Sequence, residues 1–151
     1  PTATTTFTPT PTGTATNTPT PTPTVRPTYQ IGISLLNATV ENGSCPVYQV
    51  NYTDSNGTSQ PITTYAALSP CESGYVAKFR PSPGGTFNST ATVNRVSPDT
   101  TVFDNTVIQF IKNDVVVNSV FLTQGEPVSS ETYTFLNVNT EDVLKVQISE
   151  G

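Results

Sequence analysis

Residues 106–122, TVIQFIKNDVVVNSVFL, decide the fold class of this chain. Two runs rich in Val, Ile and Phe, TVIQFI and VVVNSVFL, flank the polar residues Lys112, Asn113 and Asp114. β-Branched and aromatic residues favour strands, and a short polar connection between two such runs indicates a tight turn. The stretch therefore predicts two antiparallel strands joined in a hairpin.

Similar strand patterns recur between Tyr29 and Ile148. Apolar and polar residues alternate in YQIGISLL (29–36), PVYQVNYT (46–53), GYVAKF (74–79), TFNSTATVNRV (86–96) and VLKVQI (143–148). The sequence DSNG (54–57) is a second hairpin signal, because Asn-Gly accepts positive φ angles. No segment has apolar residues at helical spacing over three turns. We expect an all-β domain over residues 29–151, an antiparallel β-sandwich of about nine strands with immunoglobulin-like or jelly-roll topology.

The same alternation predicts which side chains fill the core of this domain. Large apolar residues at expected inward positions are Ile33, Val50, Phe79, Phe110, Phe121, Phe135 and Val146. The tyrosines, which are Tyr29, Tyr48, Tyr52, Tyr65, Tyr75 and Tyr133, also lie within alternating segments. This placement predicts core positions and cross-strand pairs for the tyrosines.

The C-terminal part of the chain resembles a class of surface module. The stretch IQFIKNDVVVNSVFL…YTFLNVNTEDVLKVQI is similar to the closing strands of immunoglobulin-like and C1q-like jelly-roll modules of surface proteins and virion appendages. The features that carry the resemblance are the hairpin and a turn Asp before the last strand. The resemblance implies a binding or structural module more often than an enzyme.

Residues 1–28 have a different composition. They include 21 Pro or Thr residues, and every even position from Thr2 to Thr24 is Thr. Frequent Pro excludes a helix and favours an extended arm in polyproline II. A spacer or linker is one interpretation, and repeat slippage in the gene could also produce the pattern. The other interpretation is an array of O-glycan acceptors on Thr4, Thr6, Thr8, Thr10, Thr12, Thr14, Thr16, Thr18, Thr20, Thr22 and Thr24. Phe7, a large apolar residue in this arm, is a candidate anchor into a neighbouring subunit.

Two further features favour an extracellular protein. The chain has two cysteines, Cys45 and Cys71, which an oxidising compartment would pair in a disulfide. Candidate N-glycosylation acceptors in N-x-[ST] motifs are Asn37, Asn42, Asn56 and Asn88. The chain begins with Pro rather than Met, which indicates a processed product or a fragment. We expect an extracellular location or one on a cell or virion surface.

The composition argues against several classes of function. His is absent, which removes the commonest general base and the commonest metal ligand. The carboxylates mostly lie beside expected turns, so we expect no enzyme, cofactor or metal site. With a net charge of −5 and only six scattered basic residues, nucleic acid is not an expected partner. No apolar run is long enough for membrane insertion.

These observations lead to two functional hypotheses. The first is a non-enzymatic structural module whose copies assemble into a surface fibre, filament or virion appendage, with the arm as glycosylated spacer or inter-subunit connector. The second is a carbohydrate-binding or adhesive module, because Pro/Thr tracts resemble the linkers of carbohydrate-binding modules in cellulases. The absence of Trp and the expected burial of the tyrosines favour the first hypothesis.

Overall fold

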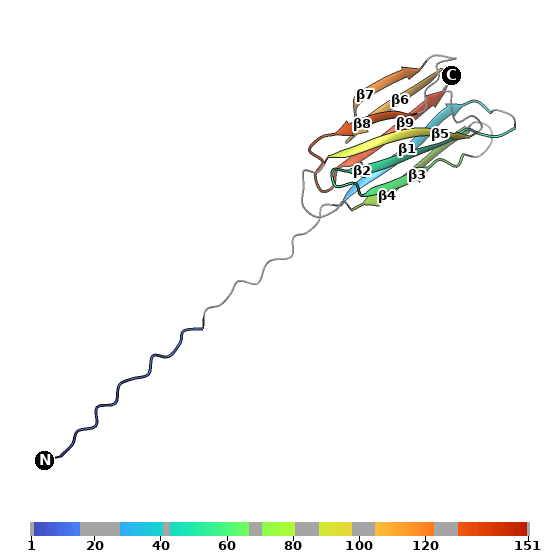
Figure 1. Cartoon of the computed structure of the whole chain (residues 1–151). Helices are drawn as coiled ribbons and strands as arrows, with labels where there is room; N and C mark the ends of the chain where they lie inside the picture. Colours follow the sequence, from blue (N-terminus) through green and yellow to red (C-terminus); the bar gives the residue numbers. More distant parts are fainter. Residues whose placement is uncertain are drawn as a thin grey trace.

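The computed structural model describes residues 2–15, 28–40, 43–66, 71–80, 88–97, 105–122 and 130–150. These residues contain nine β-strands and no helix (Figure 1). The strands are β1 (Tyr29–Ala38), β2 (Val47–Asp54), β3 (Ser59–Thr63), β4 (Cys71–Phe79), β5 (Ser89–Ser97), β6 (Thr106–Lys112), β7 (Val115–Leu122), β8 (Glu131–Phe135) and β9 (Val143–Glu150). The all-β prediction is confirmed.

The strands form two sheets in a sandwich-like arrangement (Figure 1). The five-stranded sheet has the order β4-β1-β9-β6-β7, and the four-stranded sheet has the order β3-β2-β5-β8. Neighbouring strands are antiparallel, except that β1 and β9 are parallel. The sequence patterns did not predict this parallel pair, because alternation within one strand carries no information about its distant partner.

Both predicted hairpins are present. In the β2–β3 turn, the Asp54 carboxylate accepts hydrogen bonds from the backbone N–H groups of Asn56 at 2.9 Å and Thr58 at 2.8 Å. The β6–β7 turn has Asn113 and Asp114 at φ angles of 51° and 63°. Two consecutive positive φ angles are characteristic of the type I′ turn, whose twist matches that of a two-residue hairpin.

The core lies between the two sheets. Of the residues predicted to form it, Ile33, Val50, Phe79, Phe110, Phe135 and Val146 are buried. The prediction for Phe121 is wrong, because this side chain is 66% exposed. Leu122 is buried and Val120 packs against the core, so strand alternation turns the intervening Phe121 to the outer face.

The tyrosines divide into two groups. Tyr29, Tyr48 and Tyr52 are buried, and Tyr133 is partly buried against the core, as predicted. The prediction is wrong for Tyr65 and Tyr75, which are 82% and 56% exposed. Tyr65 follows the end of β3, and Tyr75 lies on β4 at the edge of its sheet.

The predicted disulfide joins Cys45 to Cys71, with a Cα–Cα distance of 5.5 Å. Cys45 precedes β2 of the four-stranded sheet, and Cys71 begins β4 of the five-stranded sheet. The bond therefore ties one sheet to the other. Such bonds are typical of proteins that fold in oxidising compartments.

Removing the disulfide is expected to destabilise the domain. Replacing both Cys45 and Cys71 by Ser should lower the free energy of unfolding by about 2–5 kcal/mol, because the unfolded chain is no longer constrained by the bond. Urea unfolding of the double variant beside the oxidised parent measures the difference. An unchanged midpoint would show that the bond adds nothing to stability, and two alkylatable thiols in the unreduced parent would show that it does not form.

Residues 2–15 form no helix or strand (Figure 1), and each of them is exposed. Phe7 is 90% exposed. The candidate acceptors from Thr4 to Thr14 are therefore accessible in the structure, whereas those from Thr16 to Thr24 lie outside the described residues. In the part of the chain that is described, no helix is long and apolar enough to span a membrane.

Candidate interaction surfaces

Strand β7 forms one edge of the five-stranded sheet. Within the described residues it pairs only with β6. Its side chains include no charge, and the large apolar ones exposed on it are Val115 at 62%, Val116 at 46%, Val117 at 41% and Phe121 at 66%. An exposed strand with apolar side chains and a free row of backbone groups is a template for pairing with another chain. We call this surface the β7 edge.

A shallow groove adjoins the β7 edge. It has a volume of about 250 Å³ and is lined by Asn105, Val107, Phe121, Ser149 and Glu150. Phe121 pairs with Val107 across β6 and β7, so both apolar side chains contribute to the same outer face. The groove and the β7 edge therefore share the exposed side chain of Phe121.

Strand β4 forms the opposite edge of the same sheet. Tyr75 and Val76 are 56% and 55% exposed there. A Cβ atom on Gly32 of β1 would lie 3.2 Å from the Tyr75 carbonyl oxygen and 3.4 Å from Val76 Cγ2. Because Gly32 has no side chain, Val76 of β4 can lie close to β1 on the outer face of the sheet. We call this surface the β4 edge.

Two small grooves flank the exposed ring of Tyr65. One, of about 310 Å³, is lined by Pro61, Ile62, Thr63, Tyr65 and Tyr75. The other, of about 280 Å³, is lined by Gly43, Ser44, Cys45, Val47, Tyr65 and Ala66. Sequence alternation missed this surface because it placed Tyr65 inside a strand, whereas β3 ends at Thr63.

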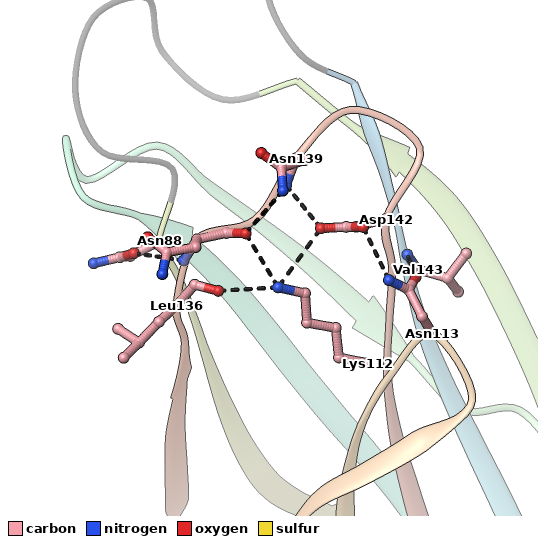
Figure 2. A network of polar contacts seen from close by, with 8 residues as sticks. Asn88, Lys112, Asn113, Leu136, Asn139, Asp142 and Val143 are labelled. Atoms are coloured by element: carbon pink, nitrogen blue, oxygen red, sulfur yellow. Dashed lines mark hydrogen bonds and ion pairs between the residues drawn. The ribbon is translucent and has the colours of Figure 1, made fainter.

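A network of polar contacts holds the β6–β7 turn, which leads into the β7 edge (Figure 2). The Lys112 ammonium donates hydrogen bonds to the carbonyl oxygens of Leu136 and Asn137 at 3.0 and 3.1 Å, and its Nζ lies 3.7 Å from Asp142 Oδ2. Asn113 donates to Asp142 Oδ1 at 2.9 Å and accepts from the Val143 N–H at 2.8 Å. The turn that begins β7 is thereby tied to the connection between β8 and β9.

The charge of Asp142 is stabilised within this network. Partial burial disfavours its ionised form, but the N–H of Asn139, the amide of Asn113 and the ammonium of Lys112 outweigh burial and hold the pKa of Asp142 below its ordinary value. The turn Asp that the sequence resemblance singled out is therefore a structural anchor at this end of the domain. The sequence did not reveal the contacts with Lys112 and Asn113, which lie about 30 residues earlier in the chain.

A second set of polar contacts lies in the core between the sheets and involves Arg95, Glu150 and Tyr48. Arg95 Nη1 of β5 is 3.6 Å from Glu150 Oε1 of β9, and the two side chains are 1% and 4% exposed. The Tyr48 hydroxyl of β2 donates a hydrogen bond to the same Glu150 oxygen. The Arg95 guanidinium also lies 5.8 Å from the centre of the Tyr48 ring, a cation–π distance. These contacts link three strands across the sandwich.

Burial alters the ionisation of three core tyrosines. Burial raises the pKa of Tyr29 to about 12. Burial also raises the pKa of Tyr48, with the Glu150 carboxylate adding to the effect, and burial raises the pKa of Tyr52, whose hydroxyl donates to the Gly32 carbonyl oxygen at 2.6 Å. In the unfolded chain these phenols return to an ordinary pKa of about 10.

We therefore predict a loss of stability at alkaline pH. Above about pH 10 the unfolded chain releases phenolic protons that the folded chain retains, so the free energy of unfolding falls as pH rises from about 10 to 12. The stabilising effect is complete below pH 10. Urea unfolding at intervals from pH 8 to 12 measures the slope, and replacing Tyr52 by Phe should make it less steep. A pH-independent free energy of unfolding over this range would contradict the prediction.

The candidate N-glycosylation acceptors lie in different settings. Asn37 is exposed at the end of β1 with a φ angle of 51°, and Asn56 is exposed in the β2–β3 turn. Asn88 is partly buried, and its Oδ1 accepts a hydrogen bond from the Asn137 N–H at 3.1 Å (Figure 2). Asn42 lies outside the described residues. The exposed positions of Asn37 and Asn56 suit modification best.

Among the described residues, no group of three or more His, Cys, Asp and Glu side chains could hold a metal ion. The observed features define the class of molecule as an all-β, disulfide-bonded protein of two sheets with exposed sheet edges. No protein-family model, curated protein or solved structure matches the chain.

Proposed function

We propose that this chain is a non-enzymatic, extracellular structural module whose copies assemble into a surface fibre, filament or virion appendage. The observation that carries the proposal is the β7 edge, where, among the residues that the structure describes, the strand pairs on one side only and four apolar side chains are exposed. Proteins that remain monomeric usually protect such edges with charges, Pro or very short strands. A module that assembles through this edge has no such requirement.

Other features fit the same function. The disulfide suits an oxidising environment outside the cytoplasm. The arm of residues 1–28 then acts as a glycosylated spacer or inter-subunit connector, and the exposure of Thr4 to Thr14 is consistent with sugar attachment there. Phe7, at 90% exposure, is available to insert into a neighbouring copy.

Sedimentation velocity over a range of protein concentrations tests the proposal. The complete chain should form larger species as its concentration rises, because assembly depends on mass action. Replacing Phe121 and Val116 by Lys should suppress these species, since two charges would then lie on the β7 edge. Replacing the exposed Val96 of β5 by Lys is the matched control and should leave assembly intact. A complete chain that stays monomeric throughout would refute the proposal.

A second candidate function rests on the exposed aromatic surface at Tyr65 and Tyr75. Aromatic faces beside a groove are suited to packing against sugar rings or an extended peptide, so the chain could act as a carbohydrate-binding or adhesive module. A glycan array probed with the complete chain tests this function. Selective binding that disappears in Tyr65→Ala but persists in Phe121→Ala would favour it, and an array without selective signal would exclude the glycans tested.

A further inference from the structure

We propose that copies of this chain join head to tail, with the β7 edge of one copy paired antiparallel to the β4 edge of the next. The inference rests on the proposed assembly and specifies its geometry. Each five-stranded sheet would then continue into the sheet of its neighbour. Because the two paired surfaces are different, the contact leaves one free edge at each end and generates an open filament rather than a closed pair.

The strand directions permit this continuation. β1 and β9 run parallel, β4 is antiparallel to β1, β6 is antiparallel to β9, and β7 is antiparallel to β6. β7 and β4 of one sheet therefore run in opposite directions. When a second copy is placed beside the first in the same orientation, β7 meets the incoming β4 as an antiparallel neighbour. Antiparallel pairing is the more stable arrangement per residue.

The two sheets differ in how their edges are protected. The four-stranded sheet ends in β3 and β8, which have five residues each. Both strands are short, and β3 also contains Pro61, so both edges have features that discourage pairing. β4 and β7 have nine and eight residues and contain no Pro. The two edge strands that are long enough to pair with another copy therefore both belong to the five-stranded sheet.

The side chains on these two edges are compatible. Val76 and Val116 lie in one cross-strand row of the sheet, which runs from Val76 through Gly32, Lys145 and Ile111 to Val116. In an unstaggered junction the exposed Val116 of one copy would face the exposed Val76 of the next on the same side of the sheet. This apposition would remove apolar surface from water on both copies.

The charges beside that row are complementary. The next cross-strand row begins at Val115 on β7 and ends at Ala77 on β4. The partners between them are Lys112, Leu144 and Ile31. Exposed Asp114 precedes Val115 and exposed Lys78 follows Ala77, so the same register brings this acid and this base to one end of the junction. Opposite charges on facing strands favour one register over its alternatives.

An irregularity in β7 limits the length of the ladder. The register of β7 against β6 shifts between Val116 and Asn118, which leaves Val117 as an extra residue in a bulge. Bulges interrupt pairing and twist a strand locally. We therefore expect the regular segment from Asn118 to Leu122 to supply the backbone hydrogen bonds of the junction. The Val116–Val76 contact would lie next to the bulge, on the side away from this segment.

Two complementary variants test this geometry. The first carries Val116→Lys and Phe121→Lys, which block the β7 edge, and the second carries Tyr75→Lys and Val76→Lys, which block the β4 edge. Because all four side chains are exposed, the folds should persist, as circular dichroism and unfolding midpoints of each variant can verify. Sedimentation velocity is then run on each variant alone and on an equimolar mixture.

Head-to-tail pairing predicts that each variant alone is monomeric and that the mixture forms one species of twice the monomer mass. In that species the free β7 edge of the second variant covers the free β4 edge of the first. If the second variant dimerises alone, two β7 edges pair with each other, and the inference is wrong although assembly stands. A mixture without dimers, beside an unmodified chain that polymerises, also overturns it. An unmodified chain that never assembles overturns both the geometry and the proposed function.

Discussion

Replacing Phe110 by Ala is expected to lower the free energy of unfolding by about 3–5 kcal/mol. The side chain is fully buried, and its ring centre lies 5.2 Å from that of Tyr133 and 6.3 Å from that of Phe135. Phe110 belongs to the five-stranded sheet and both partners to the four-stranded sheet. Truncation would leave a cavity between the sheets and remove these aromatic contacts at the same time.

Phe121→Ala is the matched control for this measurement. It removes the same atoms from the next strand, but its side chain is 66% exposed, so the expected change in unfolding free energy is within about 0.5 kcal/mol. Chemical denaturation is measured on both variants under conditions in which the parent is monomeric. Equal losses in the two variants, or a nearly unchanged Phe110→Ala, would contradict the assignment of Phe110 to the core.

Neutralising Glu150 is expected to cost about 3–5 kcal/mol, because Glu150→Gln leaves the charge of Arg95 buried without its partner. The side chains of Arg95 and Glu150 are 1% and 4% exposed, so water does little to compensate either charge. The Tyr48 hydroxyl donates to the same carboxylate, and that hydrogen bond would also weaken.

Two further variants separate the buried pair from charge effects in general. Glu72→Gln removes a carboxylate from an exposed position on β4 and should change the unfolding free energy by about 0.5 kcal/mol or less. The combination Arg95→Met with Glu150→Leu removes both charges and should restore much of the stability, because a buried ion pair and an apolar pair are often similar in free energy. A Glu150→Gln variant as stable as Glu72→Gln would show that the pair is not buried in solution.

Local sequence patterns predicted those parts of the fold that depend on neighbouring residues. The turns at 54–57 and 112–114 were predictable because positive φ angles favour particular residue types at particular positions. Alternation of apolar and polar residues identified most of the core, because successive side chains of a strand point to opposite faces of the sheet. It failed for Phe121, because alternation alone does not say which face of a strand is turned to the core. It failed for Tyr75, because a residue on an edge strand can remain exposed at an inward position.

The candidate interaction surfaces depend on distant parts of the chain and could not be read from the sequence in this way. The β7 and β4 edges become apparent only when the order of strands in the sheet is known. The Arg95–Glu150 pair joins residues on different sheets, and single charged residues within alternating strands gave no sign of a buried partner. In contrast, the Cys45–Cys71 bond was predictable, because two cysteines allow only one intramolecular pairing.

Electron microscopy of native material, with the arm and any modifications it carries, tests the central claim most directly. The account predicts regular filaments whose repeating unit is one two-sheet domain, with the five-stranded sheets continuous from copy to copy. Glycopeptide mass spectrometry on the same sample would show whether Thr4 to Thr24 carry sugars. Isolated, unassembled particles at native concentration would contradict the account.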